Sequence, residues 1–238
     1  MAGRDATTTS SPFAMVDRRR AAIDLAIVLA VFAIGSASLP VLAPLLRKGH
    51  GLGGALALAS YQFTLEGLAP LTLIAIHRES FRDYGLRRER LAYSLVLAVV
   101  LAFLYDAALS LHAGAPLWIP LRRQPAVRMS LEAGFPGALV GIAITAAVWG
   151  ALEGFFGVYF ARKVSDVLIA PYRGWLSAGG LGFAVFNGTI HVVVGQGLEG
   201  FLTSFASGYA IAVIPSVTGN AWGALLVQTL TKAAGHRS

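Results

Sequence analysis

The sequence predicts an all-α, polytopic integral membrane protein, a helical bundle of about seven transmembrane helices with a range of six to eight. Of its 238 residues, 56% are hydrophobic and 13% are charged, whereas an ordinary soluble domain has roughly 25% charged residues. The apolar residues also gather in runs close to the 20 or so residues that a helix needs to cross a bilayer. These observations exclude a soluble globular enzyme and place any function within the membrane.

The first 20 residues form a polar and then basic tail that ends in Arg18, Arg19 and Arg20. The apolar run that follows is too long for the core of a secretory signal, so it predicts a first membrane helix. Residues 21–238 are expected to form a single transmembrane domain. Its helices are predicted, from the apolar runs, over residues 21–46, 52–76, 91–111, 136–161, 176–194, 198–214 and 221–232.

Basic residues at the ends of these runs predict the orientation. With the N-terminus in the cytoplasm, the inner side receives Arg4, Arg18–Arg20, Arg78, Arg82, Arg87, Arg88, Arg90, Arg162, Lys163 and Arg173. The outer side receives Arg47, Lys48, Arg122, Arg123, Arg128, Lys232 and Arg237, and the positive-inside rule favours this arrangement. Residues 116–131 could instead lie in the interface or form an eighth partial span, which would move the C-terminus.

The net charge of +7 is interpreted as a set of topology signals and contacts with anionic lipids rather than as a nucleic-acid site. Membrane lipids are therefore expected partners, and the compact chain favours the prokaryotic plasma membrane. No nucleic-acid partner is expected, and the sequence leaves the oligomeric state open.

Several ionisable residues fall inside the apolar runs, where each costs at least about 2.5–3.5 kcal/mol unless it faces protein or water. They are Asp24, Glu66, Asp106, Glu153 and His191, and Lys232 closes the last run. A zinc site needs three or four ligands, which one histidine and scattered acids do not supply. The chain has no cysteine, so thiol chemistry is excluded, and neither a metal nor another cofactor is expected.

Two of these residues lie on glycine-rich helical faces. Glu153 shares a face with Gly150, Gly154 and Gly157, so another helix can approach it closely. A carboxylate shielded from bulk water in this way is suited to act as a general base.

His191 shares a face with Asn187, Gly188 and Gly195, and an imidazole with an amide one turn away could orient a water or stabilise an oxyanion. The alternative is that Glu153 and His191 only form hydrogen bonds between helices that hold the bundle together.

Four short motifs follow one another along residues 78–232. A basic loop closes with Gly85-Leu86, Glu153 opens a motif that runs to Val158, His191 ends a second, and Thr218-Gly219 forms a turn before the last helix. In order and even spacing, these motifs resemble the CAAX-processing and bacteriocin-immunity (CPBP) family of glutamic intramembrane proteases.

The resemblance implies roles for individual residues. Glu153 would activate water and His191 would hold that water or the oxyanion. Gln228 stands where the family has a histidine and could still donate a hydrogen bond through its amide. Asn187, in place of the family's phenylalanine, and Lys232, in place of its asparagine, would support the site. The chain departs from the family's first motif at Gly154, which replaces a second glutamate, and at Val158, which replaces an arginine.

The function implied is hydrolysis of a membrane-associated peptide or protein substrate by an intramembrane endopeptidase. A second hypothesis is a catalytically inactive relative that acts as a membrane scaffold or immunity-type protein. A third is a small transporter in which Glu66, Asp106 and Glu153 form a proton path.

Overall fold

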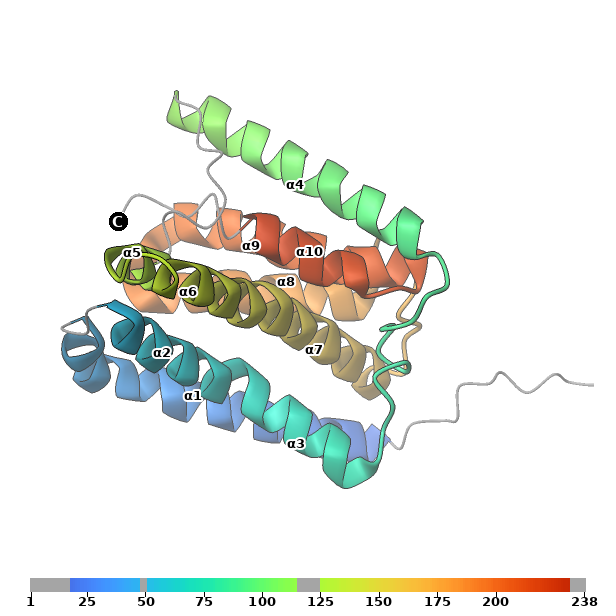
Figure 1. Ribbon diagram of the computed structural model, residues 1–238. Helices are drawn as coiled ribbons and strands as arrows, with labels where there is room; N and C mark the ends of the chain where they lie inside the picture. The colour runs from blue at the N-terminus through green and yellow to red at the C-terminus, as the bar shows by residue number, and fades with distance from the viewer. Residues whose placement is uncertain (1–17, 48–50, 115–124, 232–238) are drawn as a thin grey trace, which may run out of the picture.

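The computed structural model describes residues 18–47, 51–114 and 125–231, and within them it contains helices and no strands (Figure 1). In order along the chain, the helical elements are α1 (Arg18–Arg47), α2 (Gly51–Gln62), η1 (Phe63–Gly67), α3 (Leu68–His77), α4 (Leu91–Ala113), α5 (Pro125–Glu132), α6 (Gly137–Thr145), η2 (Ala146–Leu152), α7 (Glu153–Val167), α8 (Ala178–His191), η3 (Val192–Gln196), α9 (Gly197–Thr218) and α10 (Trp222–Thr231). The three η elements are π-helical. The all-α prediction is confirmed for this part of the chain.

Four helical stretches in the described part are long and apolar enough to cross a membrane, namely Arg18–Ser38, Leu91–His112, Gly137–Val167 and Ala178–Thr218. They agree with a membrane protein but do not confirm the predicted count of about seven spans. Helices also form over the predicted runs 52–76 and 221–232, as α2 to α3 and as α10. These helices are not among the four candidate spans. The predicted tail up to residue 17, most of residues 116–131 and Lys232 lie outside the described residues.

The last of the four stretches folds back on itself, so that α8 and α9 pack side by side. The backbone leaves helical geometry at Gly195, where φ is 89°, and at Gly197, where φ is 63°. Both values favour glycine because it lacks a Cβ. The bend brings Gly188 of α8 against Phe201 of α9, and it lies between the two predicted helical runs, 176–194 and 198–214.

Helix α7 runs through the middle of the bundle, with α1 on one side and α8, α9 and α10 on others (Figure 1). Its phenylalanines form the centre of the core: the ring of Phe160 stacks on Phe186 of α8 at 4.4 Å, and Phe156 stacks on Phe32 of α1 at 6.0 Å. A helix surrounded in this way must be apolar on nearly every face, which fits the buried run from Glu153 to Ala161.

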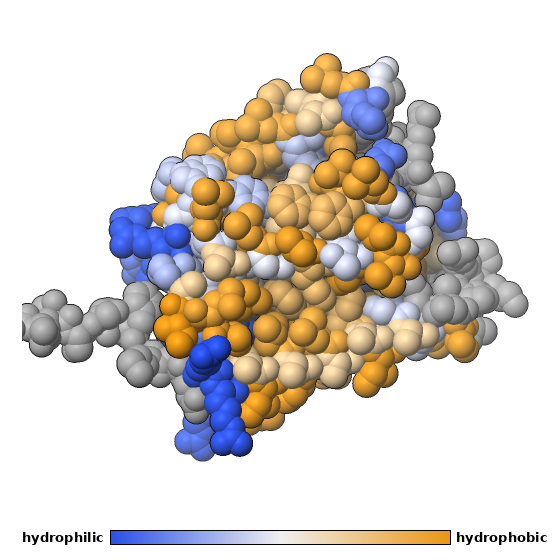
Figure 2. Space-filling model, turned by 180° about the vertical axis from the view of Figure 1, so that it is seen from behind, coloured by the Kyte–Doolittle hydropathy of each residue, from blue (hydrophilic) through white to orange (hydrophobic). Residues whose placement is uncertain are grey.

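The face shown in Figure 2 carries a broad apolar band with hydrophilic residues gathered towards its ends. Large apolar side chains are also exposed on α4, Val96, Val99, Phe103 and Leu111 among them. One end of the bundle is formed by the loop of residues 78–90, which runs past the start of α4 and the end of α7 (Figure 1).

Candidate functional site

Glu153 is buried at the point where the π-helical η2 gives way to α7; its residue is 7% exposed. The glycines around it bring α10 into backbone contact. A Cβ built on Gly154 would lie 2.9 Å from Cα of Leu225, and one built on Gly150 would lie 2.1 Å from Oγ1 of Thr229. The close approach predicted from the glycine-rich face is thus present, and α10 is the helix that makes it.

Gln228 lies on α10 and is buried, 2% exposed. Along the helix it falls between Leu225 and Thr229, the residues that meet Gly154 and Gly150. The helix that carries Gln228 therefore packs against the segment that carries Glu153, and the two helices form one interface. A carboxyl group and an amide in such an interface can bind a water and donate a hydrogen bond beside it.

The other two predicted residues lie on α8, which packs against α7 in the opposite direction. Gly157 meets the ring of Phe183, and Gly179 meets the carbonyl of Ala161. This register places Asn187 at the level of Glu153 and His191 one turn farther along. Helix α7 continues to Val167, beyond the predicted end of its apolar run at residue 161, so Glu153 and the end of α8 overlap in depth.

Asn187 and His191 both form hydrogen bonds within the bundle. The Asn187 side-chain amide donates to the carbonyl oxygen of Ser204 on α9, at 2.7 Å. His191 is the last residue of α8 and is half-buried; its Nδ1 lies 2.7 Å from Oε1 of Gln196. Asn187 thus joins α8 to α9, and Gln196 orients the imidazole of His191.

A π-helical segment adjoins three of the polar residues predicted within the membrane. Glu66 lies inside η1, Glu153 directly follows η2, and His191 directly precedes η3. Short π-helical segments within α-helices occur frequently at functional sites. The first two also touch, because a Cβ on Gly67 would lie 2.7 Å from Cδ2 of Leu152. Glu66, 8% exposed, therefore belongs to the same interior region as Glu153.

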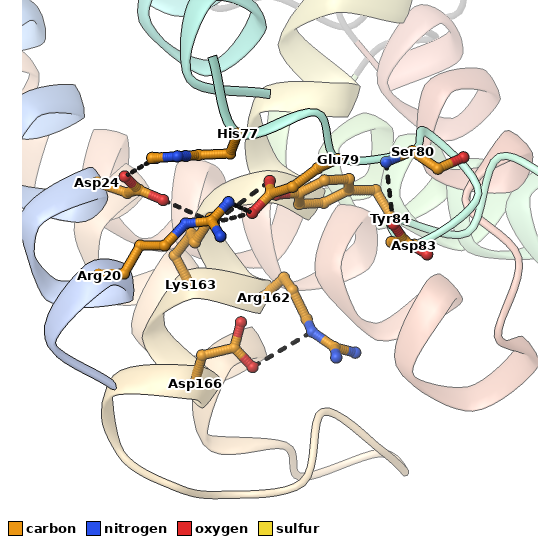
Figure 3. Close-up of polar contacts among 10 residues, drawn as sticks. All are labelled: Arg20, Asp24, His77, Glu79, Ser80, Asp83, Tyr84, Arg162, Lys163 and Asp166. Atoms are coloured by element: carbon orange, nitrogen blue, oxygen red, sulfur yellow. Dashed lines mark hydrogen bonds and ion pairs between the residues drawn. The ribbon is translucent and has the colours of Figure 1, made fainter. Parts of the chain in front are cut away.

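A second cluster of polar residues, at the end of the bundle with the loop 78–90, was not predicted. Lys163 of α7 is 1% exposed, and its Nζ lies 2.8 Å from Oδ2 of Asp24 and 3.2 Å from Oε1 of Glu79 (Figure 3). Arg20 approaches the same Glu79 at 2.6 Å, and Nε2 of His77 lies 2.9 Å from Oδ1 of Asp24. These five residues, the charge cluster, join α1, the end of α3 and α7.

The aromatic side chains beside the charge cluster complete its enclosure. Nζ of Lys163 lies 5.2 Å from the ring centre of Tyr159 and 6.0 Å from that of Tyr84. The Tyr84 hydroxyl donates a hydrogen bond to Glu79. Burial, followed by this hydrogen bond, raises the pKa of Tyr84 well above its ordinary value. The phenol therefore stays protonated and adds no charge to the cluster.

The loop 78–90 is attached to the turn between α9 and α10, so two of the sequence motifs meet. The Ala221 amide donates to the carbonyl of Gly85 at 2.8 Å, and Nε of Arg87 donates to the carbonyl of Gly219 at 2.8 Å. The fully buried Asn220 donates through its side chain to the carbonyls of Arg87 and Glu89, at 2.6 and 2.9 Å. Gly85-Leu86 and Thr218-Gly219 thus form one structural unit.

Sequence reasoning missed Lys163, Glu79 and Asn220. Lys163 follows Arg162 at the end of an apolar run, a pattern typical of a side chain that extends to the interface. A signal was nevertheless present in Asp24, an acid four residues after three arginines within the first apolar run. Such an acid requires a cationic or hydrogen-bonding partner.

No group of three or more possible metal ligands occurs among the described histidines and acids. Comparisons of the chain with protein-family models, with curated proteins and with solved structures give no match.

Proposed function

We propose that the protein is an intramembrane endopeptidase that hydrolyses a membrane-associated peptide with a water activated by Glu153. The observation that carries this proposal is the burial of Glu153 next to the close contact of Gly154 with α10, the helix on which the buried Gln228 lies. The resemblance of the motifs to those of glutamic intramembrane proteases adds to it.

In the proposed step, the Glu153 carboxylate accepts a proton from water while the water oxygen attacks the peptide carbonyl carbon. The Gln228 amide donates a hydrogen bond to the oxyanion that forms. When the C–N bond breaks, the proton held by Glu153 passes to the departing nitrogen, which leaves one acid and one amine product. His191, oriented by Gln196, stabilises the attacking water or the oxyanion. The proposal also includes Lys232 as a residue that supports the site.

A second candidate function is favoured by the hydrogen bonds of Asn187 and His191. Both side chains bind groups of their own bundle, as they would in a catalytically inactive scaffold or immunity-type protein. In that case a cellular phenotype of the gene deletion would be restored equally well by wild type and by a variant with Glu153→Ala and His191→Ala.

Hydrolysis is tested with the full chain purified into lipid nanodiscs and offered a panel of prenylated and transmembrane peptides. We expect Glu153→Gln to lower cleavage by about 10²–10⁴-fold, the usual contribution of a general base. Asp106→Asn is the matched control, because it also replaces a buried carboxyl by an amide, but on α4. Cleavage by Glu153→Gln at the wild-type rate would contradict the proposal.

A further inference from the structure

A pocket of about 350 Å³ opens at the end of the bundle, between the loop 78–90 and the turn after α9. Its lining includes three arginines, Arg82, Arg87 and Arg162, and the side chains of Tyr84 and Tyr172. It lies beside the charge cluster, since Tyr84 contacts both and Arg162 precedes Lys163 on α7. The proposed hydrolysis does not use these arginines.

The walls of this pocket are fixed before any ligand arrives. The loop and the turn are joined through Gly85, Arg87 and Asn220, by the hydrogen bonds described above. Asn220 is itself held by Ser94, whose hydroxyl donates to its carbonyl at 2.9 Å. A preformed site avoids part of the entropic cost of ordering its side chains on binding.

All three arginines line the pocket, and two of them contact protein groups through Nε. Arg87 uses Nε to bind the carbonyl of Gly219, which leaves the two terminal nitrogens of its guanidinium. Nε of Arg162 lies 3.4 Å from Asp166, and its terminal nitrogens turn away from that carboxylate (Figure 3). Arg82 is exposed at the rim. Guanidinium groups bind phosphate through two parallel hydrogen bonds.

Among the residues that line the pocket, arginines outnumber carboxylates by one. Two carboxylates, Asp83 and Glu89, also line it, and that of Asp83 accepts a hydrogen bond from the amide of Ser80 at 3.0 Å. Burial raises the pKa of Tyr84 and of Tyr172 above the ordinary value, so both phenols are neutral. Three arginines and two carboxylates thus line the pocket, and a third carboxylate, that of Asp166, pairs with Arg162 outside the lining.

The position of the pocket matches the depth of lipid headgroups. Candidate spans begin at Arg18 and Leu91 and end at Val167 and Thr218 on this side of the bundle. Anionic headgroups attract basic residues at this level, and a pocket of this volume is within the usual range for small ligands. We propose that the pocket binds a phosphate anion, carried either by the headgroup of an anionic lipid or by a small soluble phosphoester.

The experiment measures binding to the full chain purified in neutral detergent. One arm titrates phosphatidylglycerol against phosphatidylcholine and counts bound lipids by native mass spectrometry; the other titrates glycerol 3-phosphate by calorimetry. Arg82→Gln is compared with Arg88→Gln, which removes the same charge from the same loop outside the pocket. We expect the dissociation constant to rise about tenfold for Arg82→Gln, the loss of one charge-assisted hydrogen bond, and less than about twofold for Arg88→Gln.

Each outcome decides the proposal. Phosphatidylglycerol binding that falls in Arg82→Gln alone supports it with lipid as the source, and the same pattern with glycerol 3-phosphate supports it with a soluble source. Equal losses in Arg82→Gln and Arg88→Gln overturn it, because they show only a diffuse attraction to the basic loop. Absence of binding in both arms also overturns it. A second variant, Arg162→Lys, keeps the charge but removes the planar fork, and a loss of affinity there supports the pocket.

Discussion

Lys163 shows what a single side chain does at the end of this bundle. Its ammonium group lies between Asp24 of α1 and Glu79 of the loop, at 2.8 and 3.2 Å. Because Lys163 and Asp24 are both almost fully buried, neither charge is compensated by water. The pair therefore fixes the position of α1 against α7 at the level where the helices reach the interface.

We predict that Lys163→Met lowers the free energy of unfolding by about 3–5 kcal/mol, because it leaves the buried Asp24 without its cation. The double variant Lys163→Met with Asp24→Asn should regain part of this loss, since both charges are then removed. Reversible unfolding in mixed micelles of all four proteins of the cycle measures the coupling. Additive effects of the two substitutions would show that the pair does not interact.

Asn220 is a second residue whose removal should be costly. Its side chain satisfies the carbonyls of Arg87 and Glu89, and each backbone acceptor left without a donor costs about 1–3 kcal/mol. We predict that Asn220→Ala lowers the free energy of unfolding by about 2–4 kcal/mol. The same micelle assay tests this, with Asn187→Ala as a comparison because it removes a single hydrogen bond, to Ser204.

At the residue scale, the sequence could identify Asp24, Glu66 and Glu153 as buried, because an acid inside an apolar run must find a partner. It could not identify the partners. Lys163 and Glu79 are 84 residues apart in the chain, and their contact depends on the path of the loop 78–90, which no local pattern encodes. The expectation that Gln228 shares a site with Glu153 came from the motifs alone, not from the residue types.

Between elements, the contact of α7 with α10 depends on glycine. Gly154 lies so close to Leu225 that any side chain would meet the backbone of α10 rather than a flexible group. Backbone atoms cannot move aside locally, so a larger residue must push the whole helix away.

We predict that Gly154→Ala lowers the melting temperature measurably and that Gly154→Leu prevents folding. Gly53→Ala is the control, because a Cβ there meets nothing within 4 Å. Gly154→Glu, which would restore the second glutamate of the resembled motif, is expected to destabilise the protein for the same reason. A Gly154→Glu variant with unchanged melting temperature would show that α10 can move away from α7 without loss of stability.

The helices themselves were predictable from apolar runs because burial of each run requires a helix in a lipid environment. The π-helical segments were not. Two of them, η1 and η2, touch each other through Gly67 and Leu152, so they form at a contact between helices. That condition belongs to tertiary packing and leaves no periodic signal in the sequence.

For the molecule as a whole, the proposed orientation makes a prediction about chemical accessibility. The chain lacks cysteine, so single-cysteine variants can be labelled without background. We predict that Arg88→Cys, at the end with the pocket, is protected from a membrane-impermeant maleimide in intact cells, whereas Glu132→Cys, on α5 at the other end (Figure 1), reacts. The reverse pattern would mean that the N-terminus is outside. Reaction of both would contradict a membrane-spanning bundle.

The separation of Asp24 and Lys163 by 139 residues also bears on how the protein is made. At the usual rate of 5–20 residues per second, a ribosome needs about 7–28 s to add that length of chain. During this interval α1 already carries its acid, while the lysine that pairs with it does not yet exist. The pair between α1 and α7 can therefore form only after most of the chain has been made.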